Sequence, residues 1–357
     1  MRDLLPQIDA WLADGQRVSL ATVVKVWGSA PRPLGSKMAV ATSGGMAGSV
    51  SGGCVEGAVV EEAQSVLATG VPKLVSFGVS NDDAFAVGLS CGGTIEIFLE
   101  RWDSGSMAPW RKAVEDRRLV ARALVLRSDQ AGRQALLWPE GVEISMDGSL
   151  GRDDWDRQVR LSATNGFATL GSRRERDLPD DREGDDPGHD LFVDVTAPPP
   201  RLVIVGAVHA AVHLVAMAKE AGFETIVVDP RTAFATKERF SHADRLLHSW
   251  PDEALLSLDL DANSYVALLS HDLKLDVPAL RVALPRARYV GALGSRNTHH
   301  RRLTRLAEEA GIEGALAERI HNPIGLDLGG RRAEEIAVSV LAEVVGVSHG
   351  VDYRPIP

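Results

Sequence analysis

The chain has 357 residues, of which 45% are hydrophobic and 25% charged, as expected for a soluble globular protein with two or three domains. A net charge of -10 argues against general nucleic-acid binding, which requires a basic surface. No apolar run approaches the roughly 20 residues that span a membrane. Residues 1–9 lack the apolar core of a signal peptide, and two cysteines cannot form a disulfide framework, so a cytoplasmic location is expected.

The first 105 residues predict a mixture of strands and helices. A short amphipathic helix is expected at 3–14, and a second helix at 55–68. Apolar and β-branched residues predict strands at 18–27, 37–42, 45–51, 73–79 and 94–99. The segment 28–36, which contains two prolines and Arg32, is expected to be a loop.

A glycine-rich stretch, 48–57, lies between one of these strands and the second helix. A Gly-Gly turn at a helix N-terminus directs backbone N–H groups toward an anion such as phosphate. Cys54 would lie at the first turn, where the thiolate is favoured. The stretch predicts a phosphate or cofactor cradle with a sulfur at its edge, or else a turn with a small cysteine packed as a hydrophobe. A second Gly-Gly pair follows Cys91 and could converge on the same site.

The middle of the chain carries weaker patterns. Strands are predicted at 120–126, 134–138 and 191–195, and the highly charged segment 172–190 is expected to be an exposed or mobile loop. The Pro-rich segment 197–200 is expected to be a stiff linker. We therefore expect an N-terminal mixed α/β domain over 1–197, with its motif-bearing core at 16–105, and a second domain over 198–357.

The second domain begins with a βαβ pattern, a strand at 201–206, a helix at 210–221 and a strand at 225–229, which is typical of a Rossmann-like fold. Further strands are predicted at 265–269 and 289–293, and helices at 297–309 and 333–345. Alternating strands and helices predict an α/β domain with a doubly wound parallel sheet.

The dinucleotide fingerprint of this domain is incomplete. Gly206 and Ala211 match its first and last positions, but Val208 replaces the middle glycine, where a side chain would meet the pyrophosphate. Asp229, after the second strand, is positioned to bind a ribose 2′-OH and favours NAD over NADP. The pattern thus predicts an NAD(P)-dependent oxidoreductase, or else a Rossmann domain used as a scaffold or for another ligand. Other polar candidates near strand ends are His209, Ser270, His271, Asp272, Arg296, His299, His300, His321 and Asp327.

Several segments together resemble the XdhC/CoxI family. The N-terminal ones are Gly28–Met38, Gly48–Gly57 and Leu89–Glu96, and the C-terminal ones are Gly206–His209, Val228–Arg231, Tyr289–Ser295 and Asn322–Gly329. The resemblance covers both ends of the chain and leaves about 105–195 uncovered. It departs from the family at Val208, where members commonly have glycine.

The resemblance implies a maturation factor that binds the molybdenum cofactor, assists its sulfuration and delivers it to a molybdenum hydroxylase apo-enzyme such as xanthine dehydrogenase. Such a protein is a cofactor-binding chaperone rather than a stand-alone catalyst, and it works with a cysteine desulfurase. A homodimer is compatible with its two domains. A purely scaffolding partner of a molybdoenzyme, with structural thiols, is a further alternative.

This role assigns functions to individual residues. Cys54 and Cys91 would be the reactive thiols, and Cys54 would contact molybdenum, which soft thiolates suit. The cofactor and its phosphate would be bound by Arg32, Lys37, Ser51, Gly52, Gly53, Glu56, Gly92 and Gly93. In the second domain, Gly206, His209 and Asp229 would bind a nucleotide.

Overall fold

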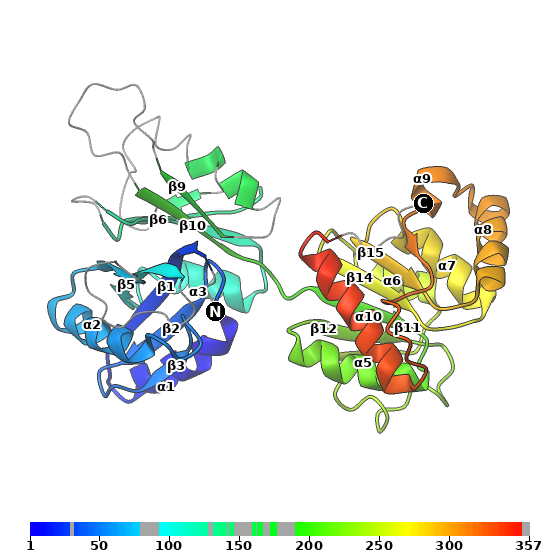
Figure 1. The fold of residues 1–357 in the computed structure, drawn as a ribbon, viewed down its shortest axis with the longest axis horizontal. Helices are drawn as coiled ribbons and strands as arrows, with labels where there is room; N and C mark the ends of the chain where they lie inside the picture. Colours follow the sequence, from blue (N-terminus) through cyan, green and yellow to red (C-terminus); the bar gives the residue numbers. More distant parts are fainter. Residues whose placement is uncertain are drawn as a thin grey trace. The chain divides into compact units, whose positions relative to one another are not determined.

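The computed structural model describes residues 1–28, 32–78, 93–127, 131–140, 143–145, 159–161, 163–166, 172–176 and 190–351. The chain forms two compact units, Met1–Pro198 and Pro199–Pro357, called unit 1 and unit 2 below (Figure 1). Among the residues described, no helix is long and apolar enough to cross a membrane.

Unit 1 contains a first antiparallel sheet, sheet A, which is covered on one face by a helix. Its strand order is β3 (Met46–Gly48), β2 (Lys37–Ala41), β1 (Val18–Trp27), β5 (Thr94–Arg101) and β4 (Lys73–Phe77). Apolar side chains such as Val59 and Ala63 of α2 (Glu56–Thr69) pack against Val23 and Ile97 of the sheet. The helix agrees with the one expected at 55–68, whereas the strand expected at 45–51 ends at Gly48.

The other face of sheet A packs against a second antiparallel sheet and two short helices. The order of sheet B is β8 (Glu143–Ser145), β7 (Gln134–Leu137), β6 (Val120–Val125), β10 (Asp190–Thr196) and β9 (Arg173–Arg176). Val24 and Phe98 of sheet A meet Leu124 and Phe192 of sheet B. The segments η1 (Arg2–Leu4), α1 (Leu5–Ala13) and α3 (Ala108–Glu115) complete the core.

Buried ion pairs join the two sheets. Lys37 Nζ lies 2.9 Å from the carboxylate of Asp194, and Arg122 pairs with Glu100, with all four side chains at most 6% exposed. The cations of Lys37 and Arg122 also lie over the ring of Trp110. Because a buried charge is costly unless it is paired, these contacts fix how sheet B lies on sheet A.

Strand β9 corrects the expectation that 172–190 is an exposed loop. Arg174 in this strand is 8% exposed and donates to Glu96 of sheet A and to Asp190 of β10. Residues 173–176 and 190 are therefore part of the sheet, and the charges of Arg174 and Asp190 are paired within it; residues 177–189 lie outside the described ranges.

Unit 2 is built on a six-stranded parallel sheet, as its alternating pattern predicts. The order is β13 (Arg245–Leu247), β12 (Glu224–Val228), β11 (Arg201–Val205), β14 (Ser264–Leu268), β15 (Tyr289–Ala292) and β16 (Ile320–His321). The direction of winding reverses between β11 and β14, which is the strand order of the Rossmann fold. The expected fold class is confirmed.

Helices cover both faces of this sheet (Figure 1). Val203 and Val205 of β11 face α6 (Pro251–Ser257), α7 (Leu273–Ala283) and α8 (Arg296–Ala310). Leu202 and Ile204 point the other way, toward α5 (His209–Glu220) and α10 (Ala333–Ser348). The short helix α9 (Gly314–Ala317) precedes β16. From Leu202 to Val205, β11 is apolar because both of its faces are buried.

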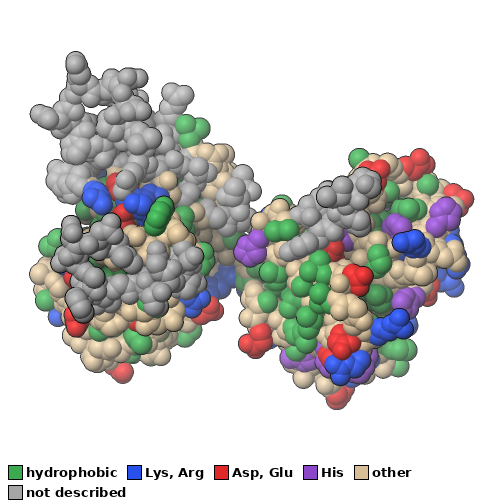
Figure 2. All heavy atoms as spheres, in the orientation of Figure 1, with side chains coloured by type: hydrophobic (Ala, Val, Ile, Leu, Met, Phe, Trp, Pro, Cys, Tyr) green, Lys and Arg blue, Asp and Glu red, His purple; other side chains and the backbone are tan. Residues whose placement is uncertain are grey.

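The outer side of α10 is apolar as well. Val338 is 45% exposed, and Ile336 and Leu341 are only partly buried. Figure 2 shows hydrophobic side chains gathered where Figure 1 draws this helix. Unit 2 therefore has a hydrophobic strip on its described surface.

Candidate functional site

The loops of unit 1 that carry the sequence motifs leave sheet A at one edge. Strand register fixes this, because Trp27 at the end of β1 is opposite Thr94 at the start of β5, and Gly48 at the end of β3 is opposite Met38 near the start of β2. The segments after Trp27 and Gly48 and the segment before Thr94 therefore leave or enter the sheet at the same end of its strands, although Met38 pairs with Ala21, six residues before Trp27.

The motif segments that the described residues include leave the sheet toward this end, and their convergence on one site stays a prediction. Arg32 is exposed in the β1–β2 loop, Cys54 lies between β3 and α2, and Gly93 immediately precedes β5. Cys91 and Gly92 lie outside the described residues. We refer to this edge of sheet A as the motif edge.

Glu56, the first residue of α2, turns back over the glycine-rich loop. Its carboxylate accepts hydrogen bonds from the N–H groups of residues 50–53 at 2.9–3.3 Å. It also accepts from the hydroxyls of Ser49, at 2.7 Å, and Ser51. Burial alone would raise the pKa of Glu56, but these hydrogen bonds, led by those from Ser51 and Ser49, lower it to about 2. The loop is thus closed around its own carboxylate.

The structure therefore gives the loop residues a different use from the one predicted. The N–H groups of Gly52 and Gly53 were expected to face a phosphate, yet they donate to Glu56. Ser51 is buried, and its hydroxyl donates to Glu56 while accepting from the N–H groups of Cys54 and Val55. Gly52 and Gly53 have φ values of +78° and +120°, which side chains disfavour and which explain the Gly-Gly pair.

Cys54 itself is an exposed thiol on this closed loop. It directly precedes Val55, the N-cap of α2, and its N–H group is fixed by the bond to Ser51 at 3.0 Å. The alternative of a small cysteine buried as a hydrophobe does not describe this position. The arrangement holds the backbone of a thiol residue rigidly at the surface of the motif edge.

Lys37 departs from its expected role. Its ammonium group donates to Asp194 at 2.9 Å and to the carbonyl of Gly35 at 2.8 Å, and its side chain is 6% exposed. It therefore serves the contact between the two sheets, and Arg32 is the exposed cation of this loop.

One residue at the motif edge was not singled out from the sequence. Trp27 is 67% exposed at the end of β1, although it belongs to a strand that is otherwise mostly buried. A tryptophan immediately before the glycine of a predicted loop was the available signal. Its exposed ring adds an apolar surface beside the loop that carries Arg32.

In unit 2, Gly206 directly follows β11, at the point where the strand order of the sheet reverses. Its φ is +105°, and a Cβ there would lie 3.1 Å from the backbone nitrogen of Ser270, so glycine allows the close approach of β11 and β14. Val208 has a φ of -81°, which suits valine, and packs partly against the core. His209 is exposed at the start of α5, with its ring 5.1 Å from that of His213.

Asp229 is fully buried, with all of its acceptor sites used. Oδ2 accepts from the N–H group of Ala207 at 2.8 Å and from Nη2 of Arg231 at 2.7 Å. Oδ1 accepts from the backbone N–H and Nε of Arg231, both at 2.9 Å. Burial would raise the pKa of Asp229, but bonds from Arg231 and Ala207 lower it. A carboxylate has about four acceptor positions, so none remains for a ribose hydroxyl, contrary to the expected role.

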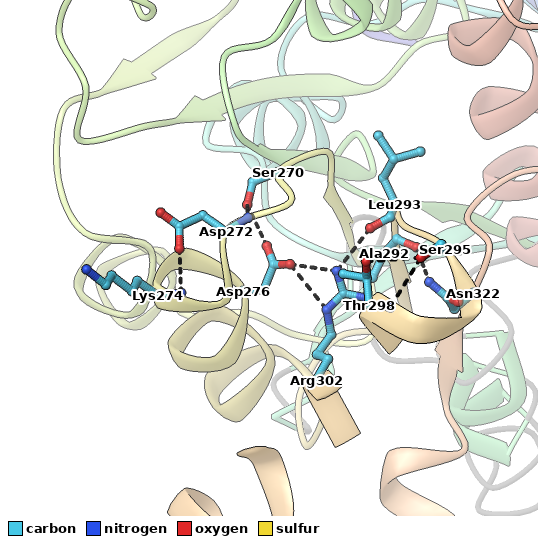
Figure 3. Close-up of polar contacts among 10 residues, drawn as sticks. All are labelled: Ser270, Asp272, Lys274, Asp276, Ala292, Leu293, Ser295, Thr298, Arg302 and Asn322. Carbon is cyan, nitrogen blue, oxygen red and sulfur yellow. Dashed lines mark hydrogen bonds and ion pairs between the residues drawn. The ribbon is translucent and has the colours of Figure 1, made fainter. Parts of the chain in front are cut away.

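A second buried network connects the loops that follow β14 and β15 (Figure 3). Asp276 of α7 accepts from Ser270 Oγ at 2.6 Å and from Arg302 Nη2, also at 2.6 Å. Arg302 donates as well to the carbonyl of Leu293 at 3.0 Å. Asp276 and Arg302 are fully buried, and burial raises the pKa of Asp276 despite these donors. The network holds two loops of the carboxyl edge in place.

The remaining polar candidates do not gather into one site. Asp272 caps α7 by accepting from the N–H group of Lys274, and His321 bonds Glu343 through Nδ1 at 2.8 Å. His271, Arg296 and His300 are exposed. Within the described ranges, no group of three or more His, Cys, Asp or Glu residues could hold a metal ion.

Comparisons with known proteins agree with this architecture. The family model described as the XdhC and CoxI family matches residues 11–78, and the XdhC Rossmann domain model matches residues 202–344. A crystal structure of a protein described as a xanthine dehydrogenase from Bacillus halodurans has the same fold, with a TM-score of 0.76 and 24% identity over 99% of this chain and 98% of its own.

Two curated relatives match almost the whole chain. One, from Bacillus subtilis, is named as a probable xanthine dehydrogenase component and is 26% identical over 95% of both chains. The molybdenum cofactor insertion chaperone PaoD from Escherichia coli is 29% identical over 94% of this chain and 85% of its own. One family model matches part of unit 1, and the other matches most of unit 2. The chain therefore belongs to the XdhC/CoxI family.

Proposed function

We propose that the protein binds the molybdenum cofactor as cargo and delivers it to a molybdenum hydroxylase apo-enzyme, such as xanthine dehydrogenase. The observation that carries the proposal is the exposed thiol of Cys54 on a loop closed by Glu56. A relative that is 29% identical over 94% of this chain and is named a molybdenum cofactor insertion chaperone supports the same role.

The groups of the motif edge suit this cargo. A thiolate is a soft ligand, so Cys54 is the residue proposed to contact molybdenum or its sulfur ligands. Arg32, exposed in the neighbouring loop, is proposed to bind the phosphate of the cofactor by charge-assisted hydrogen bonds. Gly93 lies at the same edge, and Cys91 and Gly92 remain assigned to the site from the sequence. The N–H groups that Glu56 occupies are not proposed to bind the phosphate.

Ser51 and Glu56 act in this proposal by positioning Cys54. Glu56 is held by the loop, and Ser51 fixes the N–H groups of Cys54 and Val55. We further propose that the cofactor receives its sulfido ligand while bound here, with a cysteine desulfurase as the source of sulfur.

The alternative of an NAD(P)-dependent oxidoreductase has less support. Its main sequence argument was Asp229, whose acceptor positions are filled by Ala207 and Arg231. The strand order of unit 2 is compatible with nucleotide binding but indicates no redox chemistry, because a fold does not imply a function.

The proposal is tested by cofactor retention. Wild type, Cys54→Ser and the control Glu61→Gln, which changes an exposed residue of α2, are incubated with isolated molybdenum cofactor and desalted. Molybdenum is measured by elemental analysis, and the pterin by fluorescence after oxidation. We expect retention by wild type and the control, and at least about tenfold weaker retention by Cys54→Ser. Equal retention by all three would remove Cys54 from the site, and no retention by wild type would refute the cofactor-binding role.

A further inference from the structure

The carboxyl end of β12 presents a cation where a Rossmann fold commonly presents an acid. In such folds the residue after the second strand binds the ribose, either by an acidic side chain or, for a 2′-phosphate, by a nearby arginine. Asp229 occupies this position, but it is fully buried beneath Arg231, whose side chain is 41% exposed.

The orientation of the Arg231 guanidinium follows from its bonds. Nε and Nη2 donate to Asp229 at 2.9 Å and 2.7 Å, so the edge of the planar group that carries them faces inward. Nη1 lies on the opposite side of the carbon that joins the three nitrogens. Among the residues that the structure describes, none forms a hydrogen bond with Nη1, which leaves two N–H donors for a ligand.

An aromatic ring lies against the same guanidinium. The central carbon of Arg231 is 4.5 Å from the centre of the Phe234 ring, and Phe234 is 44% exposed. A planar cation next to an exposed ring offers one group for a phosphate and one surface for stacking a base.

This pair is held close to the turn after β11. Ala207 donates its N–H to Asp229, and its carbonyl accepts from Nη1 of Arg239 at 3.0 Å. Arg239 also donates to the carbonyl of Phe234, so one side chain ties the Phe234 turn to the Gly206 turn. The position of Arg231 relative to the turn after β11 is therefore set before any ligand arrives.

We propose that unit 2 binds an adenine nucleotide that carries a phosphate on its ribose 2′-oxygen, with Arg231 as the residue that selects this phosphate and Phe234 as the stacking surface for the base. The preference is the reverse of the one that Asp229 suggests in the sequence. It concerns the adenosine end of the ligand, whereas Val208 lies near the pyrophosphate position, and it is independent of cofactor binding at the motif edge of unit 1.

Calorimetric titration of the full chain tests this proposal with three probes: adenosine 2′,5′-bisphosphate, adenosine 3′,5′-bisphosphate and 5′-AMP. Because a charge-assisted bond to phosphate is roughly twice as strong as a neutral one, we expect the 2′,5′ compound to bind at least about tenfold more tightly than 5′-AMP. Arg231→Ala is expected to remove this difference. Phe234→Ala is expected to weaken all the probes by a similar factor.

A matched control separates selectivity from folding. Arg281 is also a half-exposed arginine paired with an aspartate, Asp252, and it lies on α7, so Arg281→Ala should leave the titrations unchanged. Arg231→Lys keeps the charge near Asp229 and should retain part of the preference if Arg231→Ala does not fold. Equal binding of the 2′,5′ compound and 5′-AMP, tighter binding of the 3′,5′ compound, or no binding of any probe at millimolar concentration would overturn the proposal.

Discussion

Replacement of Glu56 by glutamine tests whether this side chain closes the Cys54 loop. The carboxylate accepts six hydrogen bonds, from four N–H groups and two hydroxyls. In Glu56→Gln the best orientation puts the new NH2 group at the Oε2 position. The Ser51 hydroxyl can rotate so that it accepts from this NH2 group. The backbone N–H group of Gly53 can only donate, so it would face the NH2 group donor to donor. The four hydrogen bonds to the remaining oxygen persist, but their acceptor is no longer charged.

These losses set the expected magnitude. An unsatisfied N–H group costs about 1–3 kcal/mol, and the loss of charge weakens the other bonds by several tenths each, so we expect a loss of about 3 kcal/mol in the free energy of unfolding. The pH dependence follows from the depressed pKa of Glu56, about 2. The carboxylate stabilises the fold fully above the ordinary glutamate pKa of about 4.3 and loses this effect as the pH falls toward 2. The difference between the two proteins should therefore shrink below about pH 4.

Urea unfolding followed by tryptophan fluorescence measures this loss. Six of the seven tryptophans precede Pro199, so the signal reports mainly on unit 1. Glu61→Gln, an exposed substitution on the same helix, is the control. If Glu56→Gln unfolds within about 0.5 kcal/mol of this control, or if the difference does not shrink in acid, then Glu56 does not hold the loop.

Four further substitutions have expected signs. Arg302→Ala leaves Asp276 buried without its cation and should destabilise unit 2 by about 3–5 kcal/mol, measured by circular dichroism in urea; an effect below about 1 kcal/mol would contradict this. Lys37→Ala should cost a similar amount in the fluorescence assay, since it removes a buried partner between the sheets. Gly53→Ala should destabilise by about 1–2 kcal/mol because the φ of Gly53 is +120°, although an added Cβ would meet nothing within 4 Å. Gly57 lies inside α2 and has equal space, so Gly57→Ala should stabilise by roughly 0.5–1 kcal/mol. The same sign for both substitutions would refute the backbone argument.

The fold class follows from the sequence because its signals are local. The strand expected at 225–229 forms at Glu224–Val228, and the helix expected at 333–345 begins at Ala333 and ends at Ser348. Apolar runs between helical segments identify a parallel sheet without knowledge of any contact. Sheet B was less visible, because β9 is an arginine-rich strand that is recognisable only from its partners.

The candidate site was predicted less completely because residue type does not reveal partners. Cys54 was identified from its spacing and is exposed, and its role stays a prediction. Lys37 was assigned to a ligand, but it pairs with Asp194, 157 residues away, and no local pattern indicates that contact. Asp229 was assigned to a ribose, but Arg231, two residues later, reaches its carboxylate first.

The ion pairs between sheets A and B limit how the chain can be shortened. The family motifs of the N-terminal half lie within 16–105, which suggests a compact fragment for study. Such a fragment would contain Lys37 and Glu100 but not Asp194 or Arg122, so two side chains that are now almost fully buried would have lost their counter-charges. Expression of the motif segment alone would yield an unstable polypeptide, and the shortest self-sufficient piece that carries Cys54 must extend through β10.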